Sequence, residues 1–166
     1  MPNESKFARE KIFKVDGVDY IVLPFKSYLI NLMDLGEDDK THLKLFPGWL
    51  EFLDAATQQG YGYVVLGKGK PVLCFGVVPQ WEGVSELWLI PDQTLIRKHR
   101  IQFHKGALAF MELAAKELSL HRLQVTVSSR NVLAVKWIKS LYFKKEGILK
   151  NYGVDKTDYI MFARLF

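Results

Sequence analysis

Four consecutive residues, Arg97-Lys98-His99-Arg100, form the densest group of basic side chains in the chain. They stand at the start of a predicted helix, where the helix dipole favours an anion and opposes added positive charge. A phosphate-bearing ligand would relieve that conflict, because guanidinium groups bind phosphate oxygens in pairs. Two interpretations stay open: a site for phosphates, or a solvated basic face that contacts nucleic acid or a protein partner.

Other residue types that carry chemistry are sparse. The single cysteine, Cys74, lies in the apolar run over residues 72–78 and is predicted to be a core residue rather than a nucleophile. His99 and His104 are five residues apart and the other two histidines are distant, so no spacing typical of a metal site is present. The glycine patterns of nucleophile elbows, P-loops and dinucleotide-binding folds do not occur either.

Length and composition favour one globular domain over residues 1–166, with residues 1–11 loosely ordered. The 166 residues are 49% apolar and 25% charged, which suffices for a packed core without disulfides. The N-terminus lacks the apolar segment of a signal peptide, and no apolar run is long enough to span a membrane. We therefore expect a cytoplasmic protein without membrane contact. The net charge of +5 comes without a nucleic-acid recognition motif, so nucleic acid is not the expected partner.

Hydrophobic periodicity and turn signals predict the elements that must position the basic cluster. Residues 12–23 alternate around the turn signal Asp16-Gly17, as in a small hairpin or a first strand. A helical region spans residues 27–59, with breaks at 35–36 and 47–48. Extended segments follow over residues 61–66, 72–78 and 85–90, separated by turns at 67–71 and 79–83.

The second half of the chain alternates between helices and strands. The elements predicted there are a helix over 100–118, a strand over 121–128, a helix over 131–142 and two strands around 147–149 and 159–165. Ser129 is the predicted N-cap of the second helix. The order β-α-α-β-β-β-α-β-α-β-β predicts an α/β fold, with a mixed sheet covered by helices on both faces.

This element order resembles that of the GNAT-type N-acetyltransferase family, and the resemblance is most specific from residue 125 onward. Asn131, Ala134, Trp137 and Phe143 fall on positions of the family pattern. The stretch Asp158-Tyr159-Ile160-Met161-Phe162 resembles the family's last strand. The resemblance implies a GNAT-like fold.

A narrower resemblance is to small podophage proteins described as internal virion or GNAT-like proteins. It lies in residues 69–79 and 87–89, and in residues 97–100 followed by Phe103. It implies a phage-encoded protein located in the host cytoplasm or in the virion.

The family resemblance implies a cleft for acetyl-CoA or another acyl-CoA, which would pair with exposed strand backbone near residues 89–90. The implied cofactor-binding residues are Leu89, Ile90, Ile96, Arg97, Lys98, His99, Arg100, Asn131 and Ala134. Asn131 has an equal alternative, which is to cap the following helix. Glu86 begins the strand that flanks the thioester in this fold and is the candidate base for the amine. An exposed strand-end glutamate without a role is the favoured alternative.

Two departures from the family pattern weaken the inference of catalysis. Arg97 and His99 replace glycines that, in the family, let backbone N–H groups approach the pyrophosphate. The cationic side chains would either bind the phosphates themselves or prevent the backbone from approaching them. Ile138 occupies the position of the family's acid tyrosine and cannot donate a proton. Tyr142, one helical turn on, is the nearest substitute.

Two hypotheses follow. In the first, the protein transfers an acetyl group from acetyl-CoA to an unknown amine. In the second, it is a catalytically degenerate GNAT-fold protein that acts in a virion or on a host protein. The expected partner is accordingly an amine substrate or a host or virion protein, and a homodimer stays open.

Overall fold

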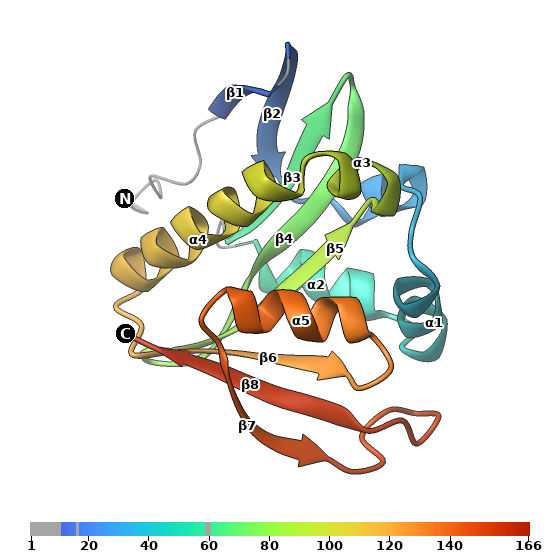
Figure 1. Cartoon of the computed structure of the whole chain (residues 1–166), viewed down its shortest axis with the longest axis vertical. Coiled ribbons are helices and arrows are strands. Elements are labelled where there is room, and N and C mark those ends of the chain that lie inside the picture. The colour runs from blue at the N-terminus through green and yellow to red at the C-terminus, as the bar shows by residue number, and fades with distance from the viewer. Residues whose placement is uncertain (1–10, 16, 59–60) are drawn as a thin grey trace.

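The computed structural model describes residues 11–15, 17–58 and 61–166 (Figure 1). Within these residues, eight strands form one sheet in the order β1-β2-β3-β4-β5-β6-β8-β7. The strands are β1 (Lys11–Val15), β2 (Val18–Pro24), β3 (Gly62–Gly67), β4 (Lys70–Trp81), β5 (Val84–Pro91), β6 (Arg122–Ser128), β7 (Lys144–Leu149) and β8 (Tyr159–Leu165). The helices are the 3-10 helix η2 (Ser27–Leu32), α1 (Glu37–Leu45), α2 (Trp49–Ala56), α3 (Gln93–Lys98), α4 (Arg100–Glu117) and α5 (Val132–Ser140). The predicted mixed α/β fold is confirmed.

Side chains of successive strand residues point to opposite faces of a sheet, and here each face has its own core. Helices α4 and α5 cover one face, in front of the sheet in Figure 1, whereas η2, α1 and α2 lie behind it. The first core combines sheet residues with α4 and α5: Val77, Leu87, Met111, Leu123, Val125, Ile138, Leu141 and Phe162. The second combines sheet residues with η2 and α2: Ile30, Leu53, Val64, Cys74, Trp88 and Ile90. Odd-numbered residues of β5 therefore face α4, and even-numbered residues face the α1 and α2 side.

The feature of the sheet that matters most for function is the junction of β5 with β6. These strands run parallel, but they pair only at Val84 with Arg122, Ser85 with Leu123 and Glu86 with Gln124. Beyond these pairs the strands diverge (Figure 1). The rest of β5 pairs with β4 alone, and the rest of β6 pairs with β8. The edge of β5 beyond Glu86 and the edge of β6 beyond Gln124 therefore face each other without pairing to each other. The space between these two backbone edges is called the opening below.

The predicted hairpin over residues 12–23 is present as β1 and β2, although Asp16 of its turn lies outside the described residues. Both predicted breaks in the helical region are also confirmed. Gly36 is the N-cap of α1, and Gly48, with a φ of 84°, begins α2. That left-handed backbone suits glycine, which has no Cβ to clash.

Cys74 is fully buried, as predicted for a core residue. Burial raises the pKa of its thiol to about 12, because the thiolate would lose its hydration. The thiol is therefore protonated at neutral pH and is not a nucleophile.

Two local predictions were wrong. Residues 93–98, for which no helix was predicted, form α3, because the Asp92 carboxylate accepts hydrogen bonds from the N–H groups of Thr94 and Leu95. The N-cap of α5 is Asn131 and not Ser129, since Asn131 Oδ1 accepts from Ala134 N at 3.0 Å.

Candidate active site between strands β5 and β6

The opening between β5 and β6 begins at Glu86. Because its position in β5 is even-numbered, Glu86 lies on the same face of the sheet as Trp88 and Ile90, toward α1 and α2. Its Oε1 accepts a hydrogen bond from Thr126 Oγ1 on β6 at 3.3 Å. A carboxylate thus stands where the two strands separate, held by a side chain from the opposite strand.

The surroundings of Glu86 make it a better base than a solvated glutamate. The side chain is half-buried, and loss of hydration raises the pKa of its carboxyl group above the usual 4.5. The hydrogen bond from Thr126 acts in the opposite sense, lowering that pKa, and is the smaller effect. The predicted alternative of an exposed strand-end glutamate does not fit this burial.

Leu89 and Ile90 lie on the unpaired part of β5, as the prediction of backbone pairing with a cofactor requires. Ile90 is buried in the core toward α2, whereas Leu89 packs on the α4 side. Their side chains are therefore occupied on both faces. What they can offer a ligand is the backbone edge that points toward β6.

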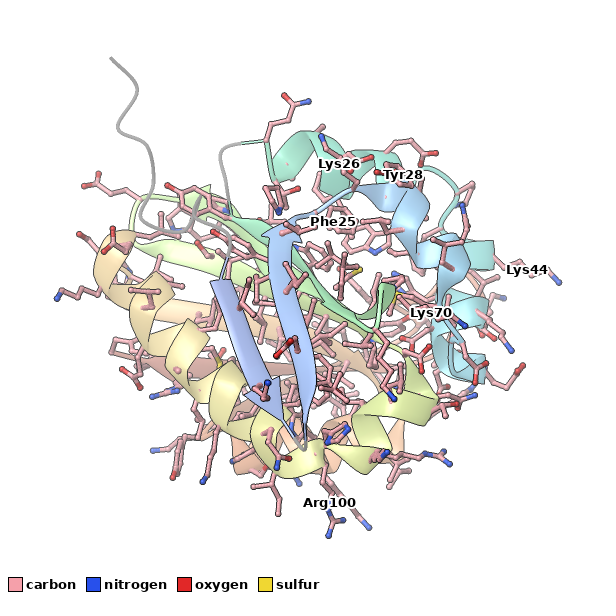
Figure 2. All side chains as sticks on the ribbon, turned by 90° about the horizontal axis from the view of Figure 1, so that it is seen from above. Phe25, Lys26, Tyr28, Lys44, Lys70 and Arg100 are labelled. Atoms are coloured by element: carbon pink, nitrogen blue, oxygen red, sulfur yellow. The ribbon has the colours of Figure 1, made fainter. Side chains whose placement is uncertain are left out.

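The four residues of the predicted basic cluster do not share one environment in the structure. Arg97, Lys98 and Arg100 are exposed at the junction of α3 and α4, where Figure 2 shows Arg100 projecting from the surface. His99 is only 3% exposed and packs edge-on against Tyr20 of β2, with the ring centroids 5.8 Å apart. The three exposed cations are available to an anion, whereas the His99 side chain is part of the interior.

A network around Asp92 fixes the start of α3 to the chain segment that precedes α1. Asp34 N donates to Asp92 Oδ2 at 2.8 Å, and Thr94 Oγ1 donates to Asp34 Oδ2 at 2.9 Å. Gln93 N also donates to the carbonyl of Asp34. These bonds hold α3, with its half-buried Ile96, against the end of β5.

The remaining predicted site residues lie on or after α5. Asn131 and Ala134 form the capping bond described above, which confirms the capping alternative for Asn131. Ile138 is buried in the core that α5 shares with the sheet, so the position matching the family's tyrosine holds no proton donor. Tyr142 lies on the other side of the sheet from Glu86: its exposed ring contacts Arg164, and Arg164 is opposite Leu123, which faces α4 and α5. Tyr142 is therefore not placed to act as the acid.

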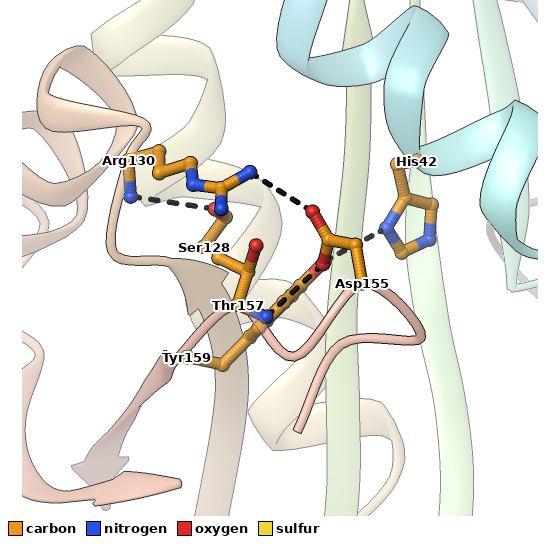
Figure 3. A network of polar contacts seen from close by, with 6 residues as sticks. All are labelled: His42, Ser128, Arg130, Asp155, Thr157 and Tyr159. Atoms are coloured by element: carbon orange, nitrogen blue, oxygen red, sulfur yellow. Dashed lines mark hydrogen bonds and ion pairs between the residues drawn. The ribbon is translucent and has the colours of Figure 1, made fainter. Parts of the chain in front are cut away.

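A small recess lies on the α1 side of the sheet, next to the open ends of β6 and β8. Its cavity volume is about 30 Å³. The lining residues come from α1, the end of β6 and the segment that enters β8: Asp38, Thr41, His42, Leu45, Ser128, Arg130, Asp155, Thr157 and Tyr159. Figure 3 shows six of them converging from these three parts of the chain.

Four polar contacts join residues of the recess (Figure 3). In two of them a backbone group donates: Thr157 N to Asp155 Oδ1 at 3.1 Å, and Arg130 N to Ser128 Oγ at 3.4 Å. The other two join side chains. Arg130 Nη1 donates to Asp155 Oδ2 at 2.9 Å, while His42 Nδ1 and Tyr159 Oη are 3.4 Å apart (Figure 3). Burial lowers the pKa of His42 and raises the pKa of Tyr159, so both side chains are uncharged at neutral pH. The charge of the recess therefore resides on its two aspartates and on Arg130.

Ionisation of Asp39, which lies beside the recess on α1, should lower the free energy of unfolding of the protein at neutral pH. Burial, aided by the charge of Asp38, raises the pKa of Asp39 to about 6. Well below its ordinary pKa of about 4, the group is protonated in the folded and unfolded chains alike, so it does not change the free energy of unfolding. As the pH rises from there to about 6, the unfolded chain loses this proton first, so the free energy of unfolding falls.

Replacing Asp39 by asparagine should therefore increase the free energy of unfolding by about 1–2 kcal/mol at neutral pH, with no gain near about pH 4. Urea denaturation of both proteins across this pH range measures the difference. An equal gain at both ends of the range would mean that packing, and not ionisation, is responsible.

Sequence reasoning missed the recess, the Thr126 hydrogen bond and Asp39. The acidic run Glu37-Asp38-Asp39 does carry a signal, since carboxylates are favoured in the first turn of a helix. That signal predicts the start of α1 and does not predict what α1 faces. In the part of the chain that the structure describes, no group of three His, Cys, Asp or Glu side chains could hold a metal ion, and no helix could cross a membrane.

No protein-family model matches the sequence, and no curated protein matches it. Solved structures do match the fold. An acetyltransferase of the GNAT family from Bacillus anthracis superposes with a TM-score of 0.67 at 17% identity, over 93% of this chain and 98% of that one. The ribosomal-protein-S5-alanine acetyltransferase from Vibrio fischeri gives a TM-score of 0.67 at 18% identity, over 93% and 96% of the two chains.

A third neighbour, RimJ from Mycobacterium smegmatis, was solved in complex with CoA-disulfide. It has a TM-score of 0.63 at 19% identity and covers 94% of this chain and 86% of that one. The chain thus has the fold of GNAT-family acetyltransferases. These neighbours are bacterial proteins, and they give no support to the narrower resemblance to podophage proteins.

Proposed function

We propose that this protein is an N-acyltransferase that moves an acyl group from an acyl-CoA to an amine. The observation that carries the proposal is the divergence of β5 and β6 beyond Glu86, which leaves two strand edges open beside a half-buried carboxylate. The fold that this chain shares with CoA-binding neighbours supports the same proposal. The acyl-CoA would supply the acyl group as an activated thioester.

The residues present fit such a donor in two respects. The edge of β5 from residue 87 to residue 90 has backbone N–H and C=O groups that β6 does not pair, and an amide-containing chain can pair with them. Arg97, Lys98 and Arg100 are exposed and form no ion pair with a described carboxylate, so they are available to phosphates.

The residues of this chain would act on the amine by positioning and proton transfer. Glu86 would take a proton from the attacking amine, directly or through a water molecule, because its raised pKa makes it the stronger base. Backbone N–H groups of β5 that point toward β6 would stabilise negative charge on the carbonyl oxygen. Holding both reactants in one opening contributes further, since the reaction becomes effectively unimolecular.

A thermal-shift titration with acetyl-CoA tests this function. We expect saturable stabilisation of roughly 5–10 °C at 100 times the Kd. The shift should be smaller for Arg97→Ala and unchanged for Lys116→Ala, which removes an exposed cation at the far end of α4. Dephospho-CoA separates contacts to the 3′-phosphate from contacts to the pyrophosphate.

A non-catalytic role is the second candidate, and a specific observation favours it. Ile138 is buried where the resemblance places a proton donor, and Arg97 and His99 replace the loop glycines. In that case the protein would be a GNAT scaffold kept for contacts in a virion or with a host protein, as the podophage resemblance implies. The absence of any shift at millimolar acetyl-CoA would favour this role and exclude the acyltransferase.

A further inference from the structure

The recess beside β6 lies on the same face of the sheet as Glu86. Thr126, which holds Glu86, and Ser128, which lines the recess, are two residues apart on β6 and so point to the same side. A strand rises about 3.3 Å per residue, which puts Ser128 of the recess roughly 7 Å beyond Thr126, the residue that bonds to Glu86. Tyr159, opposite Ser128 in β8, completes this side of the recess. A molecule that extends along β6 from Glu86 therefore reaches the recess.

The recess carries one uncompensated negative charge. Its ionised groups are Asp38, Asp155 and Arg130, because His42 and Tyr159 are uncharged at neutral pH. Arg130 is paired with Asp155 at 2.9 Å, and two negative charges with one positive charge leave a net charge of −1. Asp38 is exposed and makes no ion pair with a described cation. The field of the recess thus favours a cation, although Arg130 limits how closely a cation can approach Asp155.

An independent observation comes from Thr157. This residue is 6% exposed, and no described group completes a hydrogen bond of good geometry with its Oγ1. Figure 3 shows the hydroxyl among Ser128, Arg130 and Asp155. Its contact with the Asp155 carboxylate is the largest of the effects that lower the pKa of that acid, so what the hydroxyl oxygen still lacks is a donor. A buried hydroxyl without a complete hydrogen bond is costly, and a donor in the recess would satisfy it.

Size restricts the cation. A volume of about 30 Å³ accommodates about two water molecules. An ammonium group fits that space. Its three N–H donors match the oxygen atoms of Asp38, Thr157 and the neighbouring hydroxyls.

We propose that the recess binds a second ammonium group of the acceptor, so that the acceptor is an aliphatic diamine with its nitrogen atoms roughly 7 Å apart. One amine is acylated beside Glu86 while the other is held by Asp38 and Thr157. This inference rests on the proposed function and adds the substrate class to it. In the reaction the attacking nitrogen forms the amide bond, the carbon–sulfur bond of the thioester breaks, and the proton lost by nitrogen passes to Glu86 and then to the thiolate or to solvent.

The test compares putrescine and cadaverine with n-butylamine and n-pentylamine as acceptors of the acetyl group from acetyl-CoA. We expect kcat/KM to be at least tenfold higher for a diamine than for the monoamine of equal chain length. Asp38→Asn should lower the value for diamines about tenfold and leave monoamines unchanged, and Thr157→Val should act in the same direction. Glu37→Gln is the matched control: it removes a carboxylate from the same helical turn, but that carboxylate lies outside the recess and bonds to Lys40.

Calorimetric titration of putrescine into the protein without acyl-CoA gives a readout independent of turnover. Binding that Asp38→Asn weakens and Glu37→Gln leaves intact supports the diamine site, even if acetyl-CoA fails to bind and the acyltransferase function is wrong. If acetyl-CoA binds but putrescine does not, the diamine site is wrong and the proposed function stands. Equal use of diamines and monoamines, or an Asp38→Asn variant indistinguishable from the Glu37→Gln control, would also overturn it.

Discussion

Glu86→Gln should lower kcat/KM for acetylation of an amine by about 10²- to 10⁴-fold. Glutamine keeps the shape of the side chain and can still contact Thr126, but it cannot accept a proton. Glu86 lies where the opening begins and not among the cations of α3 and α4, so the thermal shift produced by acetyl-CoA should not change. Steady-state kinetics and the CoA titration on the same preparation separate these two effects.

The pH profile identifies the ionisation responsible. Burial raises the pKa of Glu86 above 4.5, and the base must be ionised to accept a proton. Activity of the wild-type protein should therefore fall as the pH drops through this raised pKa, whereas the residual activity of Glu86→Gln should lack that limb. The exposed Glu82, in the turn before β5, provides a control, since Glu82→Gln should behave as the wild type. Retention of more than a third of the activity by Glu86→Gln would rule out Glu86 as the base.

Phe162→Ala should reduce the free energy of unfolding by about 3–5 kcal/mol. Phe162 is fully buried in the core beneath α4 and α5, and it stands opposite Val125 of β6 in the sheet. Removal of the ring loses its apolar burial and leaves a cavity that the surrounding sheet and helices cannot close. Since a domain of this kind is stable by about 5–15 kcal/mol, much of the total would be lost.

Leu165→Ala is the control on the same strand. Leu165 is 70% exposed, so its truncation should change the free energy of unfolding by less than about 0.5 kcal/mol. Urea midpoints, with the slope of the transition checked for constancy, give both values. A loss below about 1 kcal/mol for Phe162→Ala would mean that the core around Phe162 repacks to fill the cavity.

Most of the fold was predictable because its signals are local. Alternation of Leu123, Val125 and Val127 with polar residues is typical of a strand with one buried face, and β6 has that pattern of burial. The breaks at Gly36 and Gly48 were also visible, since glycine punctuates helices. The helix α3 was not predicted, although Asp92 is a recognisable N-cap residue.

The site was less predictable because its geometry depends on contacts between distant segments. Glu86 could be selected from the resemblance, but the bond from Thr126 joins residues 40 positions apart. His42 and Tyr159 are 117 positions apart, and no local pattern in either segment indicates that they meet. His99 shows the opposite failure: the sequence placed it among exposed cations, and packing against Tyr20 buried it.

The short junction of β5 with β6 also has a consequence for how the chain reaches its native state. Strands β3, β4 and β5 form successive hairpins, and β7 pairs with β8, so these pairs can form between residues near in sequence. Strand β6 joins the second group by pairing with β8, as Ser128 does with Tyr159. The groups join through three residue pairs whose members are 38 positions apart, as Val84 is from Arg122, across α3 and α4. Closing such a loop costs entropy before many contacts compensate for it, so we expect this joining to be slower than formation of the hairpins. The same divergence that leaves backbone open for a ligand thus also leaves few contacts to stabilise the two parts of the sheet as they meet.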